Sequence, residues 1–240
     1  MRYLGGKTRN SKAITEILKS YQKNSTRYIE PFCGGLSIAE RMDSAFEYPM
    51  NLSDVHKGLI TLYKSIQNKT FAFPERNLTV KDYKWYKEHG SQEDPLYTAI
   101  GFGLSYAGKW WGGYDSYYDN RGKQGETTRS LTNSLKKTFS KPHIEKAHFW
   151  HKSYVEWKEP KDCLIYCDPP YANTTAYKGT DQFDHNYFWS KVRHWSKKNT
   201  VITSEFNAPD DFECIWSAPY KVQMCKQQQQ VTEKLFKWKG

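Results

Sequence analysis

A double proline closes an apolar, strand-like run of this sequence. Residues 162–167 have the length and composition of a β-strand, and Pro169 and Pro170 follow after a single residue. A strand cannot continue through two prolines, because each lacks a backbone N–H donor and has a fixed φ. The chain therefore turns there and presents Asp168 and Tyr171 on a stiff loop. In open α/β sheets, ligands bind at this end of the strands.

Strand-like and helix-like patterns on both sides of this loop predict an α/β fold. Apolar residues recur with the helical period in the segments 12–21, 56–67 and 184–197. Short apolar runs bounded by polar or turn residues are typical of strands. The expected strands are 27–32, 48–54, 148–154, 162–167, 200–204, 212–216, 222–225 and 233–238. Four consecutive glutamines, 227–230, are expected in a polar hairpin loop between the last two strands.

Two more strand ends carry residues that suit a nucleoside-containing ligand. Gly34 and Gly35 follow the first expected strand, and a helix is expected to begin at Ile38. A strand, a glycine turn and a helix let backbone approach a phosphate or nucleotide closely. Asp54 ends the second strand about 20 residues later, a spacing that suits a carboxylate accepting both ribose hydroxyls. Alternatively, the glycines serve only a tight turn, and Asp54 only caps the helix 56–67.

Residues 69–147 interrupt this strand and helix rhythm. Helices are expected at 80–89 and 95–106, followed by a glycine- and aromatic-rich segment, 106–114. The polar stretch 120–141 is basic and contains almost nothing apolar enough for a core, which predicts a mobile basic loop. A charged run is usually a solvated face. The neighbouring aromatic residues favour contacts with phosphates and bases instead.

Composition narrows the kinds of partner and cofactor. The net charge is +10 and aromatic residues make up 16% of the chain, which suits a surface that neutralises phosphates and stacks bases. The five cysteines form no C-x-x-C pair and no zinc pattern with histidines, so reduced thiols and no metal site are expected. The sequence contains no signal-peptide pattern at its start and no stretch near the roughly 20 apolar residues of a membrane span.

The loop 168–171 suits the chemistry of an exocyclic amine on a flat base. Such an amine is a poor nucleophile, because its lone pair is delocalised into the ring. The Asp168 carboxylate and the Pro169 carbonyl can accept its two N–H bonds, and Pro170 helps to fix the direction of that carbonyl. Tyr171 can stack on the base. The alternative is a structural proline turn with a capping aspartate.

Four motifs together resemble those of the Dam-like N6-adenine DNA methyltransferases of phages and bacteria, over nearly the full length. Residues 168–171 are similar to the catalytic D-P-P-Y motif of that family. Residues 30–35 resemble its E-P-F-x-G-x-G motif, and residues 3–7 its W-x-G-G-K motif; both bind S-adenosylmethionine in the family. Asp54 falls at the position of the ribose-binding aspartate. The order of the motifs is that of the α group of the family.

The sequence departs from the family pattern at two positions. Leu36 stands where the family has its second motif glycine, and Gly35 lies one place earlier. Tyr3 replaces the tryptophan of the first motif. The first departure is expected to alter how closely backbone approaches the cofactor, whereas neither removes the catalytic group.

The resemblance implies a Rossmann-like class I methyltransferase sheet with helices on both faces. Residues 1–68 and 148–240 would form the catalytic domain, and 69–147 an inserted, mostly helical target-recognition module. The enzyme would transfer a methyl group from S-adenosylmethionine to the N6 amine of an adenine flipped out of double-stranded DNA, with no metal. We expect it in the cytoplasm of a bacterium or of a phage host, as a monomer, with a dimer left open.

The resemblance also implies roles for individual residues. The catalytic residues would be Asp168, Pro169, Pro170 and Tyr171. The cofactor would be bound by Tyr3, Gly6, Lys7, Glu30, Pro31, Phe32, Gly34, Gly35, Ser37, Asp54, Tyr154 and Asp168. DNA would be bound by Lys109, Trp110, Tyr114, Arg121, Lys123 and Arg129. Three alternatives stay open: N4-cytosine methylation, a DNA-binding protein that has lost turnover, and methylation of RNA.

Overall fold

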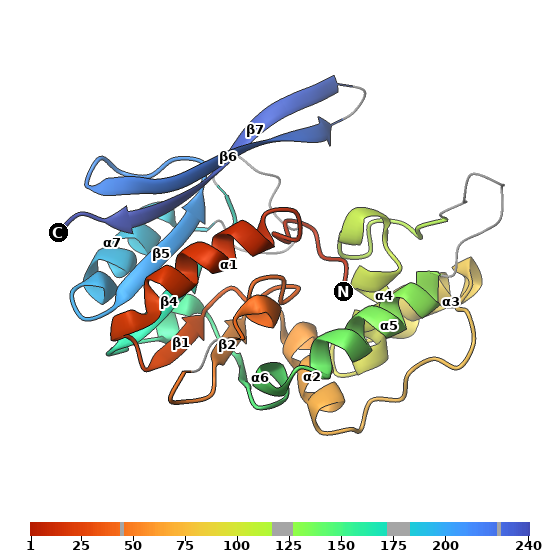
Figure 1. Cartoon of the computed structure of the whole chain (residues 1–240). Helices are drawn as coiled ribbons and strands as arrows, with labels where there is room; N and C mark the ends of the chain where they lie inside the picture. Colours follow the sequence, from red (N-terminus) through yellow and green to blue (C-terminus); the bar gives the residue numbers. More distant parts are fainter. Residues whose placement is uncertain (44–45, 117–126, 172–182, 225–226) are drawn as a thin grey trace.

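The computed structural model describes residues 1–43, 46–116, 127–171, 183–224 and 227–240. Its centre is a seven-stranded sheet flanked by helices (Figure 1). The strands are β1 (Arg27–Glu30), β2 (Asn51–Asp54), β3 (His148–His151), β4 (Cys163–Cys167), β5 (Thr200–Glu205), β6 (Phe212–Met224) and β7 (Gln227–Trp238). The helices are α1 (Ser11–Ser20), α2 (Lys57–Gln67), α3 (Val80–His89), α4 (Pro95–Gly103), α5 (Thr127–Phe139), α6 (Pro142–Glu145) and α7 (His185–Ser196).

The order of the strands in the sheet is β3-β2-β1-β4-β5-β7-β6. The first five strands are parallel, and β7 lies antiparallel between β5 and β6. The order of the parallel strands is that of a doubly wound sheet. The chain adds strands outward in one direction from β1 to β3 and in the other direction from β4 to β5, so the topological switch point lies between β1 and β4. Ligands bind at the carboxyl ends of the strands beside such a switch point. The expected Rossmann-like α/β fold is confirmed.

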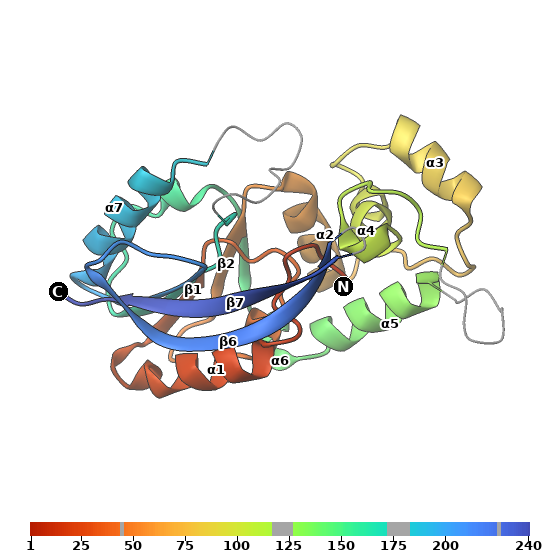
Figure 2. The same ribbon diagram turned by 90° about the horizontal axis from the view of Figure 1, so that it is seen from above.

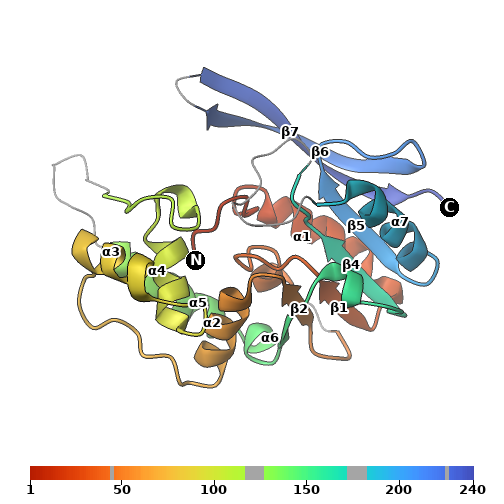
Figure 3. The same ribbon diagram turned by 180° about the vertical axis from the view of Figure 1, so that it is seen from behind.

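Helices cover both faces of the sheet because successive strand residues point to opposite sides. Helix α1 lies over one face and α7 over the other (Figures 2 and 3). In β4, Leu164 is buried in the core on the α1 side, and Ile165 is buried with Val192 of α7 on the other side. The strand is buried at all five positions, as expected for a central parallel strand.

Helices α3, α4 and α5 gather beside the sheet, next to α2 (Figure 1). The helices expected at 80–89 and 95–106 are confirmed, the second ending at Gly103. The expectation that the basic stretch 120–141 lacks core residues is wrong. Three apolar residues of α5, spaced four apart, are buried: Leu131, Leu135 and Phe139. That spacing places them in one stripe of the helix, while the lysines occupy the other side.

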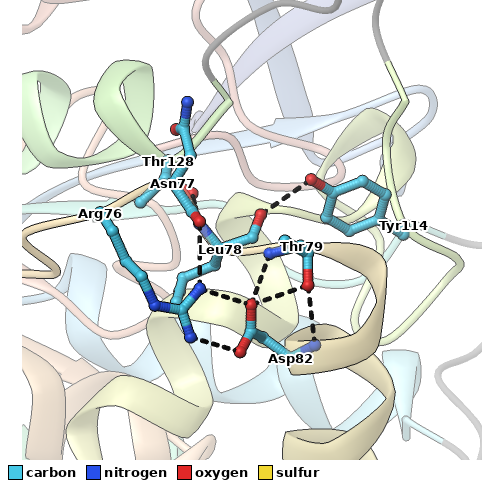
Figure 4. Close-up of polar contacts among 7 residues, drawn as sticks. All are labelled: Arg76, Asn77, Leu78, Thr79, Asp82, Tyr114 and Thr128. Atoms are coloured by element: carbon cyan, nitrogen blue, oxygen red, sulfur yellow. Dashed lines mark hydrogen bonds and ion pairs between the residues drawn. The ribbon is translucent and has the colours of Figure 1, made fainter.

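The start of α3 is fixed by a capping box (Figure 4). The Thr79 hydroxyl accepts the Asp82 backbone N–H, and the Asp82 carboxylate accepts the Thr79 N–H at 2.7 Å. The Arg76 guanidinium donates to both oxygens of Asp82, at 2.6 and 2.8 Å. This bidentate pair holds the pKa of Asp82 well below its usual range. The Asp82 carboxylate therefore stays ionised around neutral pH and keeps its place in the capping box of α3.

The residue before this cap connects three segments of the helical region. The Leu78 N–H donates to the Thr128 hydroxyl of α5 at 3.0 Å. Its carbonyl accepts the Tyr114 hydroxyl at 2.9 Å (Figure 4). The segment before α3, the helix α5 and the aromatic-rich segment are therefore held together by the backbone of one buried residue.

Two other expectations are corrected. The helix expected from Ile38 is a single 3-10 turn, Ala39–Arg41, so no α-helix begins in the described residues directly after the glycine turn, 36–43. The three short strands expected near the end of the chain are two long ones, β6 and β7, and residues 227–230 lie inside β7 rather than in a loop. Their backbone pairs with residues 221–224 of β6, and this pairing does not depend on the apolar pattern used to find strands. Among the described helices, none is long and apolar enough to cross a membrane.

Candidate active site

Adjacent strands bring the three predicted strand ends together. The glycine turn follows β1, the loop 168–171 follows β4, and Asp54 is the last residue of β2. Because β2, β1 and β4 are consecutive parallel neighbours in the sheet, their carboxyl ends share one edge. The N-terminal segment before α1 reaches the same edge and carries Lys7.

Asp168 and Lys7 form a nearly buried ion pair. The Lys7 Nζ lies 2.7 Å from Asp168 Oδ1, and the two side chains are only 8% and 18% exposed. Burial raises the pKa of Asp168 to about 6, although the Lys7 ammonium lowers it; the Glu233 carboxylate also raises it. Asp168 is therefore mostly ionised at neutral pH. Because neutral pH lies close to this pKa, small changes in nearby charge would alter its ionised fraction.

Tyr171 is fixed by contacts on its hydroxyl and its ring. The hydroxyl donates a hydrogen bond to Glu233. The Lys7 Nζ lies 4.3 Å from the ring centroid, in a cation–π contact. The Phe206 ring packs nearly perpendicular to it, with centroids 4.6 Å apart. These contacts set the plane of the ring that was expected to stack on a base.

Asp54 organises the glycine turn. Its Oδ2 accepts the Gly34 N–H at 2.9 Å, and its Oδ1 accepts the His56 N–H at 2.8 Å. The Tyr63 hydroxyl donates to the Gly34 carbonyl. The helix cap that we considered for Asp54 belongs instead to His56, whose Nδ1 accepts the Leu59 N–H at 3.3 Å. Each carboxylate oxygen has two lone pairs, so Asp54 retains acceptor capacity for a ligand.

Tyr3 packs against the two glycines of this turn. A Cβ on Gly34 would lie 2.8 Å from the Tyr3 ring, and one on Gly35 would lie 2.6 Å from its Cβ. Both contacts are too short for any other residue type. Leu36, the departure from the family pattern, has a φ of 62° and therefore adopts the left-handed conformation that favours glycine. Its side chain is buried in the core, which offsets part of the backbone strain.

The remaining predicted cofactor residues surround this turn. The Lys7 N–H donates to the Ser37 hydroxyl at 3.0 Å, and the Gly6 N–H donates to the Tyr3 carbonyl. Glu30 is buried and accepts the Tyr28 hydroxyl at 2.9 Å; burial raises the pKa of Glu30 well above its usual value. Pro31 is buried as well.

Phe32 and Tyr154 belong to one aromatic cluster beside the glycine turn. Their ring centroids are 5.3 Å apart, and both rings contact Phe188 of α7. Tyr154 lies in a 3-10 turn, Tyr154–Glu156, rather than in the strand expected at 148–154. Burial raises the pKa of Tyr154 to about 12, so its hydroxyl stays protonated.

The predicted DNA-binding residues differ in exposure. Lys109 and Arg129 are exposed, whereas Trp110 is half-buried against His56, with ring centroids 4.4 Å apart. Tyr114 is half-buried, and its hydroxyl donates to a backbone carbonyl. Trp110 and Tyr114 are therefore part of the local packing. Arg121 and Lys123 lie outside the described residues.

Sequence reasoning missed Glu233, which contacts both Lys7 and Tyr171. The signal available was an acid inside an apolar strand pattern, and that signal does not reveal which residues it contacts. Within the described part of the chain, no group of three or more His, Cys, Asp or Glu residues could hold a metal ion.

Comparison with known proteins identifies the family. Residues 3–151 match the model of the D12 class N6 adenine-specific DNA methyltransferases. The chain belongs to this family. This D12 enzyme is 24% identical over 214 residues to the DNA adenine methylase of Escherichia coli K12, covering 78% of the chain and 70% of that relative. It is 32% identical over 98 residues to the Type II methyltransferase M.CviBI of Paramecium bursaria Chlorella virus NC1A, and this alignment covers 40% of the chain and 33% of that relative.

A solved structure of an rRNA methyltransferase from Streptomyces viridochromogenes aligns with 96% of this D12 methyltransferase and 84% of its own chain. The TM-score is 0.42 and the sequence identity is 10%. The family match ends before the loop 168–171.

Proposed function

We propose that this enzyme transfers the methyl group of S-adenosylmethionine to the N6 amine of an adenine that is flipped out of double-stranded DNA. The observation that carries the proposal is the position of the Asp168 carboxylate, which is nearly buried, lies 2.7 Å from the Lys7 ammonium and directly precedes two prolines. It lies at the end of β4, one strand from the glycine turn that follows β1. A base inside a duplex cannot reach such a site, so the target nucleotide has to leave the stack.

Asp168 and the Pro169 carbonyl would activate the amine by accepting hydrogen bonds from its two N–H groups. These hydrogen bonds draw the nitrogen towards tetrahedral geometry and free its lone pair for attack. The amine becomes positively charged as it attacks, and the ionised Asp168 stabilises that charge in a largely water-free surrounding. Tyr171 would stack on the base. After the transfer, the extra proton leaves the nitrogen; Asp168, with a pKa of about 6, is a competent first acceptor.

The residues around the glycine turn fit a cationic, nucleoside-containing cofactor. Asp54 and Asp168 are acidic groups on one sheet edge, and Asp54 retains acceptor capacity for ribose hydroxyls. Phe32 and Tyr154 supply an aromatic surface beside them. S-Adenosylmethionine, when bound, supplies a methyl group on an electrophilic sulfonium. Tyr3, Lys7 and the backbone of the turn would orient that group towards Asp168.

We propose that residues 69–147 form the target-recognition module, inserted between the catalytic segments 1–68 and 148–240. Helices α3 to α5 lie together beside the sheet (Figure 1), which supports this division. Their apolar residues continue into the core of the sheet, so the module would be rigidly attached. We propose that the enzyme acts as a monomer in the cytoplasm, where chromosomal or phage DNA is present.

Product analysis tests the reaction directly. The purified chain would be incubated with S-adenosylmethionine labelled in its methyl group and with duplex DNA, and the DNA would then be digested to nucleosides. We expect the label in N6-methyldeoxyadenosine. Label in N4-methyldeoxycytidine would contradict the adenine assignment, and the absence of label would favour a DNA-binding protein without turnover. Single-stranded DNA and RNA of the same sequence serve as controls for the substrate.

The salt dependence of DNA binding tests the recognition module. Replacing the exposed residues Lys109 and Arg129 by glutamine should lower the slope of log affinity against log salt by about 0.9 for each phosphate that is no longer neutralised. The affinity should fall for all DNA sequences alike. Lys197→Gln, at the far end of α7, is the matched control and should leave the slope unchanged. Equal slopes for all variants would remove these residues from the DNA interface.

A further inference from the structure

Glu233 is a buried acid in β7 that no motif predicted. Its side chain is 4% exposed. Its neighbour in the strand, Lys234, lies opposite Glu205 in the register of β7 and β5, at the carboxyl end of β5. Burying a carboxylate is costly unless it is hydrogen-bonded or paired with a cation. Its position in β7 therefore needs compensation from groups on other elements, and the compensating groups are those of the proposed active site.

Two active-site residues supply that compensation. The Tyr171 hydroxyl donates a hydrogen bond to Glu233 Oε1, and the Lys7 Nζ lies 3.7 Å from the same oxygen. The same Lys7 Nζ lies 2.7 Å from Asp168. One ammonium group therefore lies between two carboxylates, which leaves an excess of negative charge in a nearly buried cluster.

We propose that Glu233 is a positioning residue for methyl transfer, which fixes the Tyr171 ring and balances the charge of Lys7 so that Asp168 can serve the target amine. The inference rests on the proposed function. Without a second acid, Lys7 would neutralise Asp168 at the place where a cationic transition state needs a negative group. With Glu233 present, the cluster stays negative while the target nitrogen becomes positive, and this preorganised charge needs no rearrangement during the reaction.

The charged and titratable groups that face Asp168 give the inference a pH signature. Lys7 approaches from the N-terminal segment, Glu233 from β7 and Tyr171 from the same loop, while Glu30 of β1 also interacts with Asp168. Lys7 lowers the pKa of Asp168 and Glu233 raises it. Removing the charge of Glu233 should therefore lower the pKa of Asp168 and keep it ionised to lower pH.

Glu233→Gln separates the charge from the hydrogen bond, because the amide oxygen can still accept the Tyr171 hydroxyl. We expect kcat to fall by about tenfold, less than the loss on removing a group that contacts the transition state directly. The acid limb of the kcat profile should move to lower pH, and the Kd for S-adenosylmethionine should change little. The matched control is Glu213→Gln, an exposed acid on β6 that also lies 3.7 Å from a lysine, Lys237. It should leave the rate and the profile unchanged.

A folded Glu233→Gln protein with an unmoved acid limb would overturn the inference, whatever its melting temperature. If this variant does not fold, Glu233→Asp is measured instead, since it keeps the charge but is too short to hold Tyr171. We expect it to have a lower kcat with cofactor binding retained, and full activity would overturn the inference. These outcomes all require an active unsubstituted enzyme, so failure of the proposed function is recognised separately, by the absence of N6-methyldeoxyadenosine.

Discussion

Replacing Asp168 by alanine is expected to lower methyl transfer by at least about a hundredfold to a thousandfold, with cofactor binding largely retained. The reason is that Asp168 both accepts a hydrogen bond from an N–H group of the target amine and supplies the negative charge that stabilises the developing positive charge on the nitrogen. Asp168→Asn should lose nearly as much, because its amide oxygen can accept the N–H bond but carries no charge. Single-turnover transfer of labelled methyl groups and calorimetric cofactor binding would measure the two effects separately.

The stability of these variants distinguishes a catalytic defect from unfolding. Burial raises the folded pKa of Asp168 from 3.8 to about 6, so its ionisation opposes folding. The stabilising contribution of the protonated group is complete below about pH 4 and is lost as the pH rises through about 6. Asp168→Asn avoids this cost and should be at least as stable as the parent at neutral pH in thermal unfolding. Asp43→Asn, an exposed acid paired with Lys19, is the control. Full activity in Asp168→Asn would refute the assigned role.

Replacing Lys7 by methionine should destabilise the fold by about 3–5 kcal/mol, because two nearly buried carboxylates lose their common cation. For a chain of this size, that change corresponds to a fall in Tm of roughly 6–20 °C. The pKa of Asp168 should rise above about 6, since the Lys7 ammonium lowers it in the parent enzyme. The acid limb of any remaining activity should therefore move to higher pH, opposite in direction to the effect expected for Glu233→Gln.

Lys57→Met provides the matched control for this prediction. Lys57 forms an ion pair with Glu93 in which both side chains are largely exposed. An exposed pair contributes about 0–1 kcal/mol, so Tm should fall by only a few degrees at most. An equal loss of stability in the two variants would show that Lys7 has no special role as a buried counter-charge.

The part of the site that lies at strand ends could be predicted from the sequence. Pro169 and Pro170 require a turn, glycines mark another, and Asp54 follows an apolar run, so a parallel sheet brings all three to one edge. These are local signals, each contained in a few consecutive residues. Lys7 was predicted as a site residue only through the family motif at residues 3–7. A lysine between a glycine pair and a helix does not itself indicate an acidic partner.

The remainder depends on contacts between distant segments. Glu233 contacts Lys7 across the length of the chain, and no local pattern records that contact. Helix α5 was missed because three apolar residues among polar and basic ones suffice for a buried stripe when α4 approaches closely. Gly103 permits that approach, since a Cβ there would lie 2.4 Å from Leu131. The half-burial of Trp110 likewise follows from His56, a residue far from it in sequence.

The antiparallel strand β7 separates β5 from β6, although it follows both in the chain. During synthesis, Lys7 and Asp168 leave the ribosome well before β7 does. The edge of β5 stays open until that strand pairs with it, and Glu233 reaches the cluster in the same step. Until β7 pairs with β5, Glu233 can neither share the charge of Lys7 nor accept the Tyr171 hydroxyl, so the arrangement proposed for methyl transfer is complete only once β7 has docked.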